Sequence, residues 1–412
     1  MNDRHLYWFL ILIMFFACSK NGITLPPDNP NTNLINTKFI SDTVMKHMEG
    51  IYSVSNGSES LGIEFVCKVS KHKVSFFSNK SGIFFILGYG LNPTDSSIQF
   101  SGFWRYSESS TQGIINFSVA KTDGASELLV NGISTHLQLK GNINSKESIS
   151  LQYKRPFSQY VLSHEFSIFA HHGVQTTANP PYAQNSINGA LHDEDYGVNG
   201  LEYDVRLTKD NVPICMHDAA FDIRLTEKGP LYGDFNQYSF AFLEAYVRLV
   251  DGQKVPSVAE VLEAFVDSTN MKYMWLDVKG DPDVFKYLEP VVRNAYSRAA
   301  AINRNIVIIA DIPSKQVADE YQKQPSYGID LPCMCELSLQ DAIDNKCQYF
   351  GPRFSLGLLL DDVEKGHSLG IKSFSWTIND KTTILDYMKN GKFDGFISDY
   401  PAYVVYDYYA LY

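Results

Sequence analysis

The sequence predicts a protein of two folded domains, a small all-β domain followed by a closed parallel (β/α)₈ barrel. Three observations support this prediction. The chain has 412 residues, which is long for one domain and sufficient for two. Residues 45–155 contain short runs in which apolar and polar residues alternate, as they do in antiparallel strands. From residue 160 to residue 412, apolar strands alternate with helical segments, which is typical of a parallel sheet covered by helices.

Residues 1–17 are predicted to be a signal peptide. Arg4 precedes an apolar run from Leu6 to Ala17, which is shorter than the roughly 20 residues that span a bilayer. Cys18 follows the small residue Ala17, and this order resembles the lipidation site of bacterial lipoproteins. We therefore expect an exported protein, anchored to the cell envelope (periplasm or outer membrane) only through a lipid on Cys18. The alternative is an ordinary cleaved signal and secretion.

Residues 18–44 are rich in Asn, Pro and Thr and lack periodic apolar residues, so a tether is expected there. The β-rich region at 45–155 is predicted to form a small sandwich or barrel. It contains no group of titratable residues that indicates catalysis. Its expected role is that of an accessory domain, either a spacer or a module that binds glycan or lipid.

Five cysteines follow Cys18, and their number and spacing do not indicate a disulfide framework. Cys333 and Cys335 are separated by one residue, and no matching Cys or His pair follows at the spacing of a zinc knuckle. Cys67, Cys215, Cys333, Cys335 and Cys347 are therefore predicted to be structural thiols, most of them buried.

Eight apolar segments in the second half are predicted to be the strands of a TIM barrel. They are Phe166 to Ala170, Gly200 to Val205, Tyr273 to Val278, Asn305 to Ala310, Ile329 to Cys333, Gln348 to Phe350, Ile371 to Thr377 and Asp394 to Ile397. The sixth of these has the weakest pattern.

One further apolar run, Val212 to Met216, follows the second strand too closely to be its parallel neighbour. A parallel crossover needs a dozen or more residues, so this run must turn back as an antiparallel strand. It begins a rim insertion at about 207–255, which ends where Ser257 is expected to cap the next helix.

Polar residues are concentrated where the predicted strands end. Barrel enzymes build their sites at the C-terminal ends of strands, and residues two apart on a strand share a face. The residues in these places are His171, His172, Glu202, Asp204, His217, Asp218, Asp277 and Lys279. Any one of them could be a helix cap, an ion-pair partner or a structural histidine.

Taken together, two histidines and three carboxylates on one rim indicate a hard divalent cation, Mg²⁺ or Ca²⁺, flanked by two groups that transfer protons. Zinc is less consistent with a set in which carboxylates dominate. The formal charge of −11, without a basic tract, argues against nucleic acid as a partner.

The order and spacing of these residues resemble the glycerophosphodiester phosphodiesterase family over about residues 166–405. The matching motifs are Ala170-His171-His172-Gly173, Gln184-Asn185-Ser186, Gly200 to Asp210, Val212 to Asp218, Pro256 to Leu262, Leu276 to Lys279, Trp376 to Asn379 and Ser398 to Pro401. A resemblance of this length is highly specific.

The resemblance implies a role for each matched residue. His171 and His217 correspond to the general acid and base, and Glu202, Asp204 and Asp277 to the metal ligands. Lys279 is implied to bind phosphate or to orient the ligands, and Trp376 to form a wall of the substrate pocket, with core packing as its alternative. Asn379 and Asp399 are expected to be turn and cap residues.

Three positions depart from the family pattern. His172 stands where the family has an arginine that grips phosphate, Gln184 replaces a glutamate, and Asp277 is one methylene shorter than the usual glutamate. Because histidine is shorter than arginine and titrates near neutral pH, phosphate binding through His172 is expected to be weaker or dependent on pH.

The expected reaction is metal-dependent hydrolysis of a small-molecule glycerophosphodiester to glycerol 3-phosphate and an alcohol. Two alternatives remain. One is a related phospholipase D-like phosphodiesterase acting on choline lipids, for which the aromatic insertion around Tyr238, Phe240 and Phe242 would provide an apolar rim. The other is a non-catalytic surface lipoprotein that binds a phosphate ester or glycan.

Overall fold

The computed structural model describes residues 23–27, 34–57, 61–132, 135–173, 180–281, 283–325 and 331–412. The predicted signal peptide, Cys18 and much of the predicted tether lie outside these residues. Among the described residues, no helix has the length and apolar character needed to cross a bilayer.

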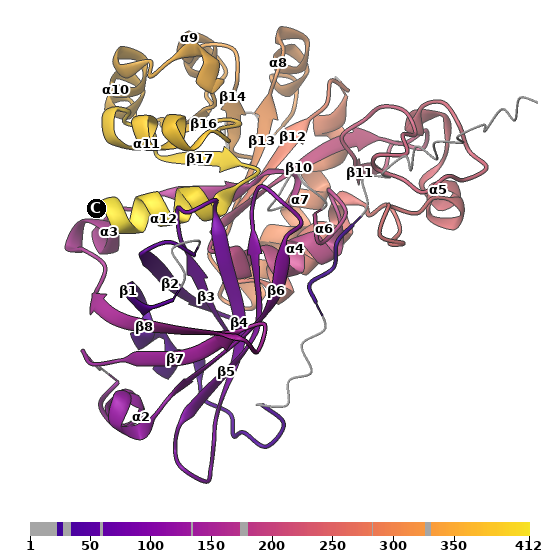
Figure 1. Cartoon of the computed structure of the whole chain (residues 1–412). Helices are drawn as coiled ribbons and strands as arrows, with labels where there is room; N and C mark the ends of the chain where they lie inside the picture. The colour runs from indigo at the N-terminus through magenta and orange to yellow at the C-terminus, as the bar shows by residue number, and fades with distance from the viewer. Residues whose placement is uncertain are drawn as a thin grey trace, which may run out of the picture.

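The N-terminal domain is a closed antiparallel barrel, which decides between the sandwich and the barrel that its sequence allowed (Figure 1). Its strands are β1 (Gly50–Asn56), β2 (Glu64–Ser70), β3 (Lys73–Phe77), β4 (Ile83–Leu91), β5 (Ile98–Tyr106), β6 (Gln112–Val119), β7 (Gln138–Ile143) and β8 (Glu147–Arg155). Each strand pairs with the next, and β1 pairs with β8 to close the barrel. Aromatic side chains such as Phe76, Phe85 and Phe117 fill the interior, so this barrel is a packed core.

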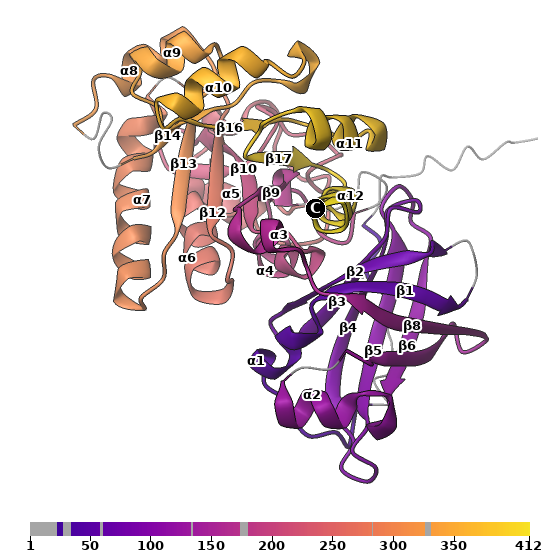
Figure 2. The same ribbon diagram turned by 90° about the vertical axis from the view of Figure 1, so that its left-hand side faces the viewer.

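Two short helices, α1 (Asp42–Met45) and α2 (Ala125–Asn131), contact each other and lie together at one end of this barrel (Figure 2). The described part of the interior contains no cluster of acidic residues and histidines that could hold a metal.

The C-terminal domain is the predicted (β/α)₈ barrel. Its strands are β9 (Ser167–Ala170), β10 (Gly200–Leu207), β12 (Tyr273–Val278), β13 (Val307–Ile312), β14 (Cys333–Cys335), β15 (Tyr349–Phe350), β16 (Lys372–Ser375) and β17 (Gly395–Ser398). The eight strands pair in parallel, and β9 closes the barrel by pairing with both β10 and β17. Seven of the predicted barrel strands are present to within a few residues, and the sixth is only two residues long. The fifth was predicted at Ile329 to Cys333, of which 329–330 lie outside the described residues, and β14 begins only at Cys333.

Helices surround this barrel on the outside. They are α3 (Gln159–Ser163), α4 (Ile187–His192), α6 (Val258–Ser268), α7 (Val284–Ala301), α8 (Lys315–Tyr321), α9 (Leu339–Asp344), α10 (Leu360–Ser368), α11 (Lys381–Asn390) and α12 (Pro401–Leu411). Ser257 caps α6 as predicted, in a reciprocal capping box with Glu260. Inside the barrel, Phe169, Trp275 and Phe374 belong to a separate apolar layer.

The rim insertion begins as predicted with an antiparallel strand, β11 (Pro213–Cys215), which pairs with the end of β10. The rest of the insertion contains one α-helix, α5 (Phe240–Tyr246), and has a small apolar core of its own around Phe235 and Leu243. In Figure 1 it projects beside the mouth of the barrel.

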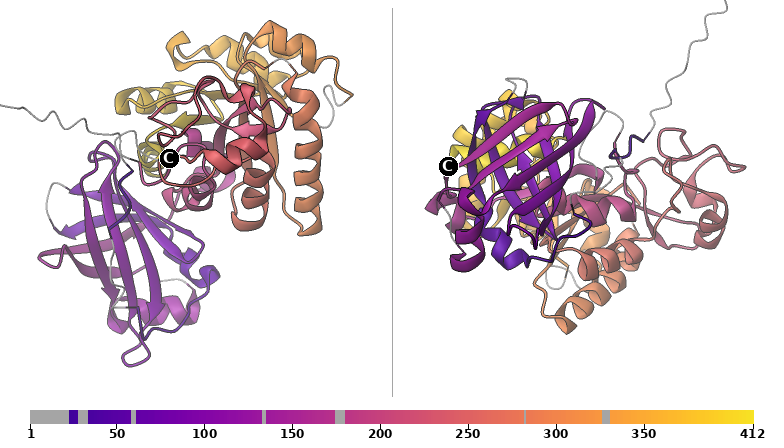
Figure 3. Two further views of the ribbon diagram at one scale, coloured as in Figure 1. Left: turned by 90° about the vertical axis from the view of Figure 1, so that its right-hand side faces the viewer. Right: turned by 60° about the horizontal axis from the view of Figure 1, so that its bottom comes forward.

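The two domains share one apolar core through α12. This helix contacts β1, β2 and β3 of the first domain and β9 and β17 of the second. Its end, marked C, lies between the two domains in the left view of Figure 3. Phe84 of β4 packs its ring against Tyr196 of the second domain at 5.0 Å between ring centroids. Lys68 Nζ and Tyr409 Oη lie 3.3 Å apart across the same junction.

Candidate functional site

The polar residues predicted from the strand ends surround one cavity of about 520 Å³ at the C-terminal mouth of the parallel barrel. The lining includes His171, Glu202, His217, Asp277, Lys279, Arg353 and Trp376. They come from β9, β10, β11, β12, β15 and β16 or from the loops that follow them, so the closed barrel brings distant parts of the sequence to one place.

Three carboxylates lie together at the base of the cavity. Glu202 and Asp204 share the inward face of β10, and the β10–β12 ladder pairs Asp204 directly with Asp277. One ligand oxygen from each lies within 4.8 Å of the other two. Glu202 and Asp204 are buried, whereas Asp277 is partly exposed at the cavity. The alternation along two parallel strands is therefore sufficient to build this triad.

The triad has the properties of a site for a hard cation. Glu202 Oε1 is buried without a hydrogen-bond partner among the described residues. Burial and the charge of Asp204 raise the pKa of Glu202 well above its usual value. A buried, unpartnered carboxylate oxygen beside two more carboxylates is costly without a cation, so the residues fit a divalent ion with oxygen ligands.

Lys279 is placed between the carboxylates, where it offsets part of their charge. Its Nζ lies 2.9 Å from Asp204 Oδ1 and also contacts Asp277. Burial opposes the charge on Lys279, but the attraction of Asp204 and Asp277 outweighs burial and raises its pKa. The ammonium group thus contacts two members of the triad directly.

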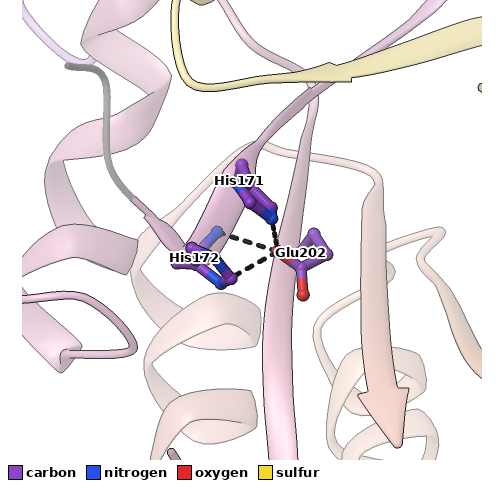
Figure 4. A group of neighbouring side chains, drawn as sticks. All are labelled: His171, His172 and Glu202. Atoms are coloured by element: carbon purple, nitrogen blue, oxygen red, sulfur yellow. Dashed lines mark hydrogen bonds and ion pairs between the residues drawn. The ribbon is translucent and has the colours of Figure 1, made fainter. Parts of the chain in front are cut away.

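His171 leaves the end of β9 and is held in one orientation by Asp399. Its Nδ1 lies 2.7 Å from Asp399 Oδ1. Its Nε2 lies 3.9 Å from Glu202 Oε2, a contact drawn in Figure 4. Asn379 accepts the Asp399 backbone N–H at 2.8 Å. Burial favours the neutral imidazole, but the Asp399 hydrogen bond and the charge of Glu202 raise the pKa of His171 to about 9. Asp399, expected as a cap residue, therefore contacts the predicted acid or base.

His217, which also lines the cavity, is held in a similar way. Its Nδ1 lies 2.7 Å from Asp218 Oδ1, and Arg224 donates to both oxygens of Asp218 at 3.0 and 2.9 Å. Burial opposes ionisation of Asp218, but His217 and Arg224 lower its pKa. Each predicted proton-transfer histidine thus has Nδ1 on a carboxylate, and Nε2 of His171 also lies 3.4 Å from the hydroxyl of Thr377, another residue that lines the cavity.

His172 turns away from the cavity that its neighbours line. Its backbone has a positive φ of 56°, and its N–H donates to Glu202 Oε2 at 2.8 Å. Its ring Nδ1 lies 2.7 Å from Asp204 Oδ2, and the buried ring packs between those of His171 and His217. Burial lowers the pKa of His172 despite the charge of Asp204. The phosphate contact expected of His172 stays a prediction, and the structure places the side chain against a carboxylate of the triad.

Gln184, a second departure from the family pattern, contacts Arg224. Gln184 Oε1 accepts from Arg224 at 3.0 Å, while the adjacent Asn185 reaches the triad. Asn185 Nδ2 donates to Asp204 Oδ2 at 2.6 Å, and its Oδ1 accepts the Asp204 backbone N–H at 2.9 Å. Asn185 therefore contacts both the carboxylate and the backbone of Asp204.

Two arginines that the sequence pattern did not single out, Arg206 and Arg353, also line the cavity. Trp376 lines it as expected, and the Arg353 guanidinium lies 4.6 Å from the centroid of its ring. Arg206, two residues beyond Asp204 on the same face of β10, also lines the cavity and donates to His217 O at 2.8 Å. The spacing by two could have identified Arg206, whereas Arg353 follows a two-residue strand that gives almost no pattern.

Glu336 is a fourth acidic group beside the triad. It follows the end of β14 and lines the cavity. Burial and the charge of Asp277 raise the pKa of Glu336 to about 8. Its place directly after a strand is the signal that could have identified it.

Comparisons with known proteins agree on one family. Residues 172–331 match the model of the glycerophosphoryl diester phosphodiesterase family. A glycerophosphodiester phosphodiesterase of Caldanaerobacter subterraneus subsp. tengcongensis is 26% identical over 243 residues, which cover 58% of this chain and 96% of that protein. A relative from Bacillus subtilis is 26% identical over 215 residues, which cover 50% of this chain and 85% of that protein. The crystal structure of a glycerophosphodiester phosphodiesterase from Parabacteroides distasonis aligns with a TM-score of 0.49 at 20% identity, covering 60% of this chain and 99% of that one.

Proposed function

Because the barrel domain of this chain belongs to the glycerophosphoryl diester phosphodiesterase family, we propose that the protein hydrolyses glycerophosphodiesters to sn-glycerol 3-phosphate and an alcohol. The single observation that best supports this proposal is the arrangement at the cavity. Two histidines, each fixed by an aspartate, flank three carboxylates that lie within 4.8 Å of one another.

Glu202, Asp204 and Asp277 are the residues that would hold a divalent cation, Mg²⁺ or Ca²⁺. Such an ion, when bound, supplies positive charge to the phosphate oxygens as negative charge develops in the transition state. Asn185 and Lys279 would fix the carboxylates, since both contact Asp204.

His171 and His217 would carry the protons. One accepts a proton from the attacking hydroxyl at its Nε2, and the other donates a proton from its Nε2 to the departing alkoxide. Asp399 and Asp218 would keep each ring in the orientation that this requires. The nucleophile is either water or the glycerol hydroxyl of the substrate, in which case water opens a cyclic phosphate afterwards.

Binding of the phosphodiester anion needs fixed cations, because the protein as a whole carries a formal charge of −11. Arg206 and Arg353 line the cavity and provide such charges. We propose that these guanidinium groups take the place of the arginine that the family has at position 172, with His172 supporting Asp204.

The test is an assay of the purified protein with glycerophosphocholine, glycerophosphoethanolamine and lysophosphatidylcholine. Release of glycerol 3-phosphate from the first two is the expected result. Turnover of the lysolipid alone would favour the phospholipase D-like alternative, and binding without turnover of any substrate would favour the binding protein.

One observation supports including a lysolipid among the substrates. The insertion carries a second cavity of about 260 Å³, lined by Phe221, Ile223, Tyr232 and Tyr246 among others. Ile223 and Tyr232 are more than 80% exposed, so the insertion presents apolar surface close to Asp218 and His217 in the sequence.

We also propose that the chain is exported and that Cys18 is lipidated, which the apolar run before this cysteine supports. Metabolic labelling with a radioactive or alkyne fatty acid tests this. Label is expected on the wild-type chain and not on a Cys18→Ser variant, and an unlabelled wild-type chain recovered from the medium would contradict lipidation.

A further inference from the structure

Two cysteines that take no part in the proposed reaction lie in direct contact near α9. Cys333 begins β14, and Cys347 lies in the loop between α9 and β15. Their sulfur atoms are 2.7 Å apart. Both are free thiols in this structure, and a disulfide would join the two sulfur atoms that are already in contact.

The sheet explains why these two residues meet. The β14–β15 ladder pairs Met334 with Tyr349, so Cys333 and Cys347 lie just before the paired residues on neighbouring parallel strands. Adjacent strands are about 4.8 Å apart, which is within the range of Cα separations that disulfides span. Both side chains belong to the apolar core on the outer face of the barrel.

We propose that Cys333 and Cys347 form a disulfide when the chain folds in an oxidising compartment. The reaction is exchange with a low-molecular-weight or protein disulfide. The two thiols lose two protons and two electrons and form one S–S bond. The donor disulfide accepts these protons and electrons and is released as two thiols.

The environment determines when this bond can form. Cys333 and Cys347 are no more than 4% exposed, so a donor cannot reach them in the folded protein. Contact with Cys333 and burial also raise the pKa of Cys347, which disfavours the reactive thiolate. The bond therefore forms during folding, and it is then protected from reduction by the same burial.

The crosslink would stabilise the part of the barrel that completes the cavity. β14 is followed by Glu336 and β15 by Arg353, and both of these residues line the cavity. β15 is only two residues long and makes few ladder hydrogen bonds. A covalent bond beside this short strand compensates for the weak local pairing, and it closes a loop of about 15 residues.

The experiment is a non-reducing peptide map. The full chain is denatured, reduced and refolded with a mixture of reduced and oxidised glutathione, its remaining thiols are blocked with iodoacetamide in denaturant, and the digest is analysed by mass spectrometry. The expected result is one linked peptide that joins Cys333 to Cys347. Iodoacetamide adducts on both cysteines after refolding with oxidised glutathione would overturn the proposal.

Cys335 provides the matched control. It lies two residues after Cys333 on the same face of β14, and it is also buried. A Cys335→Ala variant should keep the Cys333–Cys347 link, and a Cys333→Ala variant should leave Cys347 blocked by iodoacetamide. A link to Cys335 in the wild-type protein would also overturn the assignment.

A second measurement does not depend on variants that fold poorly. The oxidised wild-type protein should melt about 5–10 °C higher than the same protein refolded without oxidant, and reduction in denaturant followed by refolding without oxidant should remove the difference. Equal melting temperatures for the two preparations, with the link present in one of them, would contradict the stabilising role of the bond.

Discussion

At the scale of single residues, the two histidines of the cavity are distinguished by what holds them. His171 and His217 each place Nδ1 at 2.7 Å from an aspartate oxygen, which leaves Nε2 as the atom that can exchange a proton with a substrate. They come from the ends of β9 and β11, and the ring of His172 lies between theirs. This arrangement suits one group at the nucleophile and one at the leaving group.

We predict that His171→Ala and His217→Ala each lower kcat for glycerophosphocholine by roughly a hundredfold to ten-thousandfold, the usual contribution of a general acid or base. Steady-state kinetics measure the loss, and circular dichroism checks that both variants fold. Near-normal kcat in both would leave the site with a binding role only.

The same two variants identify the acid. An activated aryl phosphodiester leaves without protonation, so the variant that lacks the acid should recover much of its rate on bis(p-nitrophenyl) phosphate. The variant that lacks the base should not. Equal rates of the two variants on both substrates would show that the roles are not divided as proposed.

The carboxylate triad predicts that activity requires a divalent metal. Activity should be lost in excess EDTA and restored by Mg²⁺ or Ca²⁺, because Glu202, Asp204 and Asp277 repel one another without a cation. Asp277→Asn should weaken metal affinity at least about tenfold, measured by calorimetric titration. Glu227→Gln, an exposed change in the insertion, is the matched control and should bind metal normally. Full activity in excess chelator would exclude a metal requirement.

At the scale of elements, α12 carries a buried acid that nothing in the proposed reaction uses. Asp407 is 5% exposed, and its Oδ2 has no hydrogen-bond partner among the described residues. Burial raises its pKa to about 6, although Lys381 and Lys389 partly oppose this. The folded protein therefore holds a proton on Asp407 that the unfolded chain releases near pH 4.

This shift predicts a dependence of stability on pH with a definite sign. Below about pH 4 both states are protonated and Asp407 has no effect, whereas between about pH 4 and 6 stability falls as pH rises, to a loss of about 2–3 kcal/mol above pH 6. Asp407→Asn should therefore raise the free energy of unfolding relative to wild type more at pH 7 than at pH 4, measured by urea unfolding.

The matched control is Asp386→Asn, the same chemical change at an exposed position on α11. Its effect on the free energy of unfolding should be small at both pH values. A difference between Asp407→Asn and wild type that does not change between pH 4 and 7 would contradict the assignment.

At the scale of the whole molecule, the β domain and the parallel barrel are expected to unfold together. Residues of β1 to β4, including Ile51, Val66, Phe77 and Phe84, belong to the same apolar core as the barrel and its helices. Separation of the domains would expose this surface to water, at a cost that grows with the apolar area.

We predict that Phe84→Ala lowers the free energy of unfolding by about 3–5 kcal/mol, the usual effect of truncating a buried phenylalanine. It should also split the single thermal transition of the wild type into two, because Phe84 packs against Tyr196 across the junction. Phe117→Ala, in the separate core of the β domain, is the control and should destabilise that domain without removing this contact. Two independent transitions in the wild-type protein would contradict the coupling.

The sequence by itself determined the elements and most of the proposed site. Alternation along β10 was sufficient to predict that Glu202 and Asp204 share a face, and the short spacing after β10 was sufficient to predict the antiparallel β11. These predictions succeed because strand periodicity and minimum crossover length are local properties of the chain.

Tertiary structure decided what depends on neighbours distant in the sequence. Whether the β domain closes as a barrel depends on the pairing of β1 with β8, which no local pattern encodes. The direction of the His172 ring and the approach of Arg353 to Trp376 likewise depend on packing. The contact between Cys333 and Cys347 requires β14 and β15 to lie side by side. In each case the physical reason is the same: a side chain's partners are set by the closure of a sheet, and the strands that close it are separated by tens of residues along the chain.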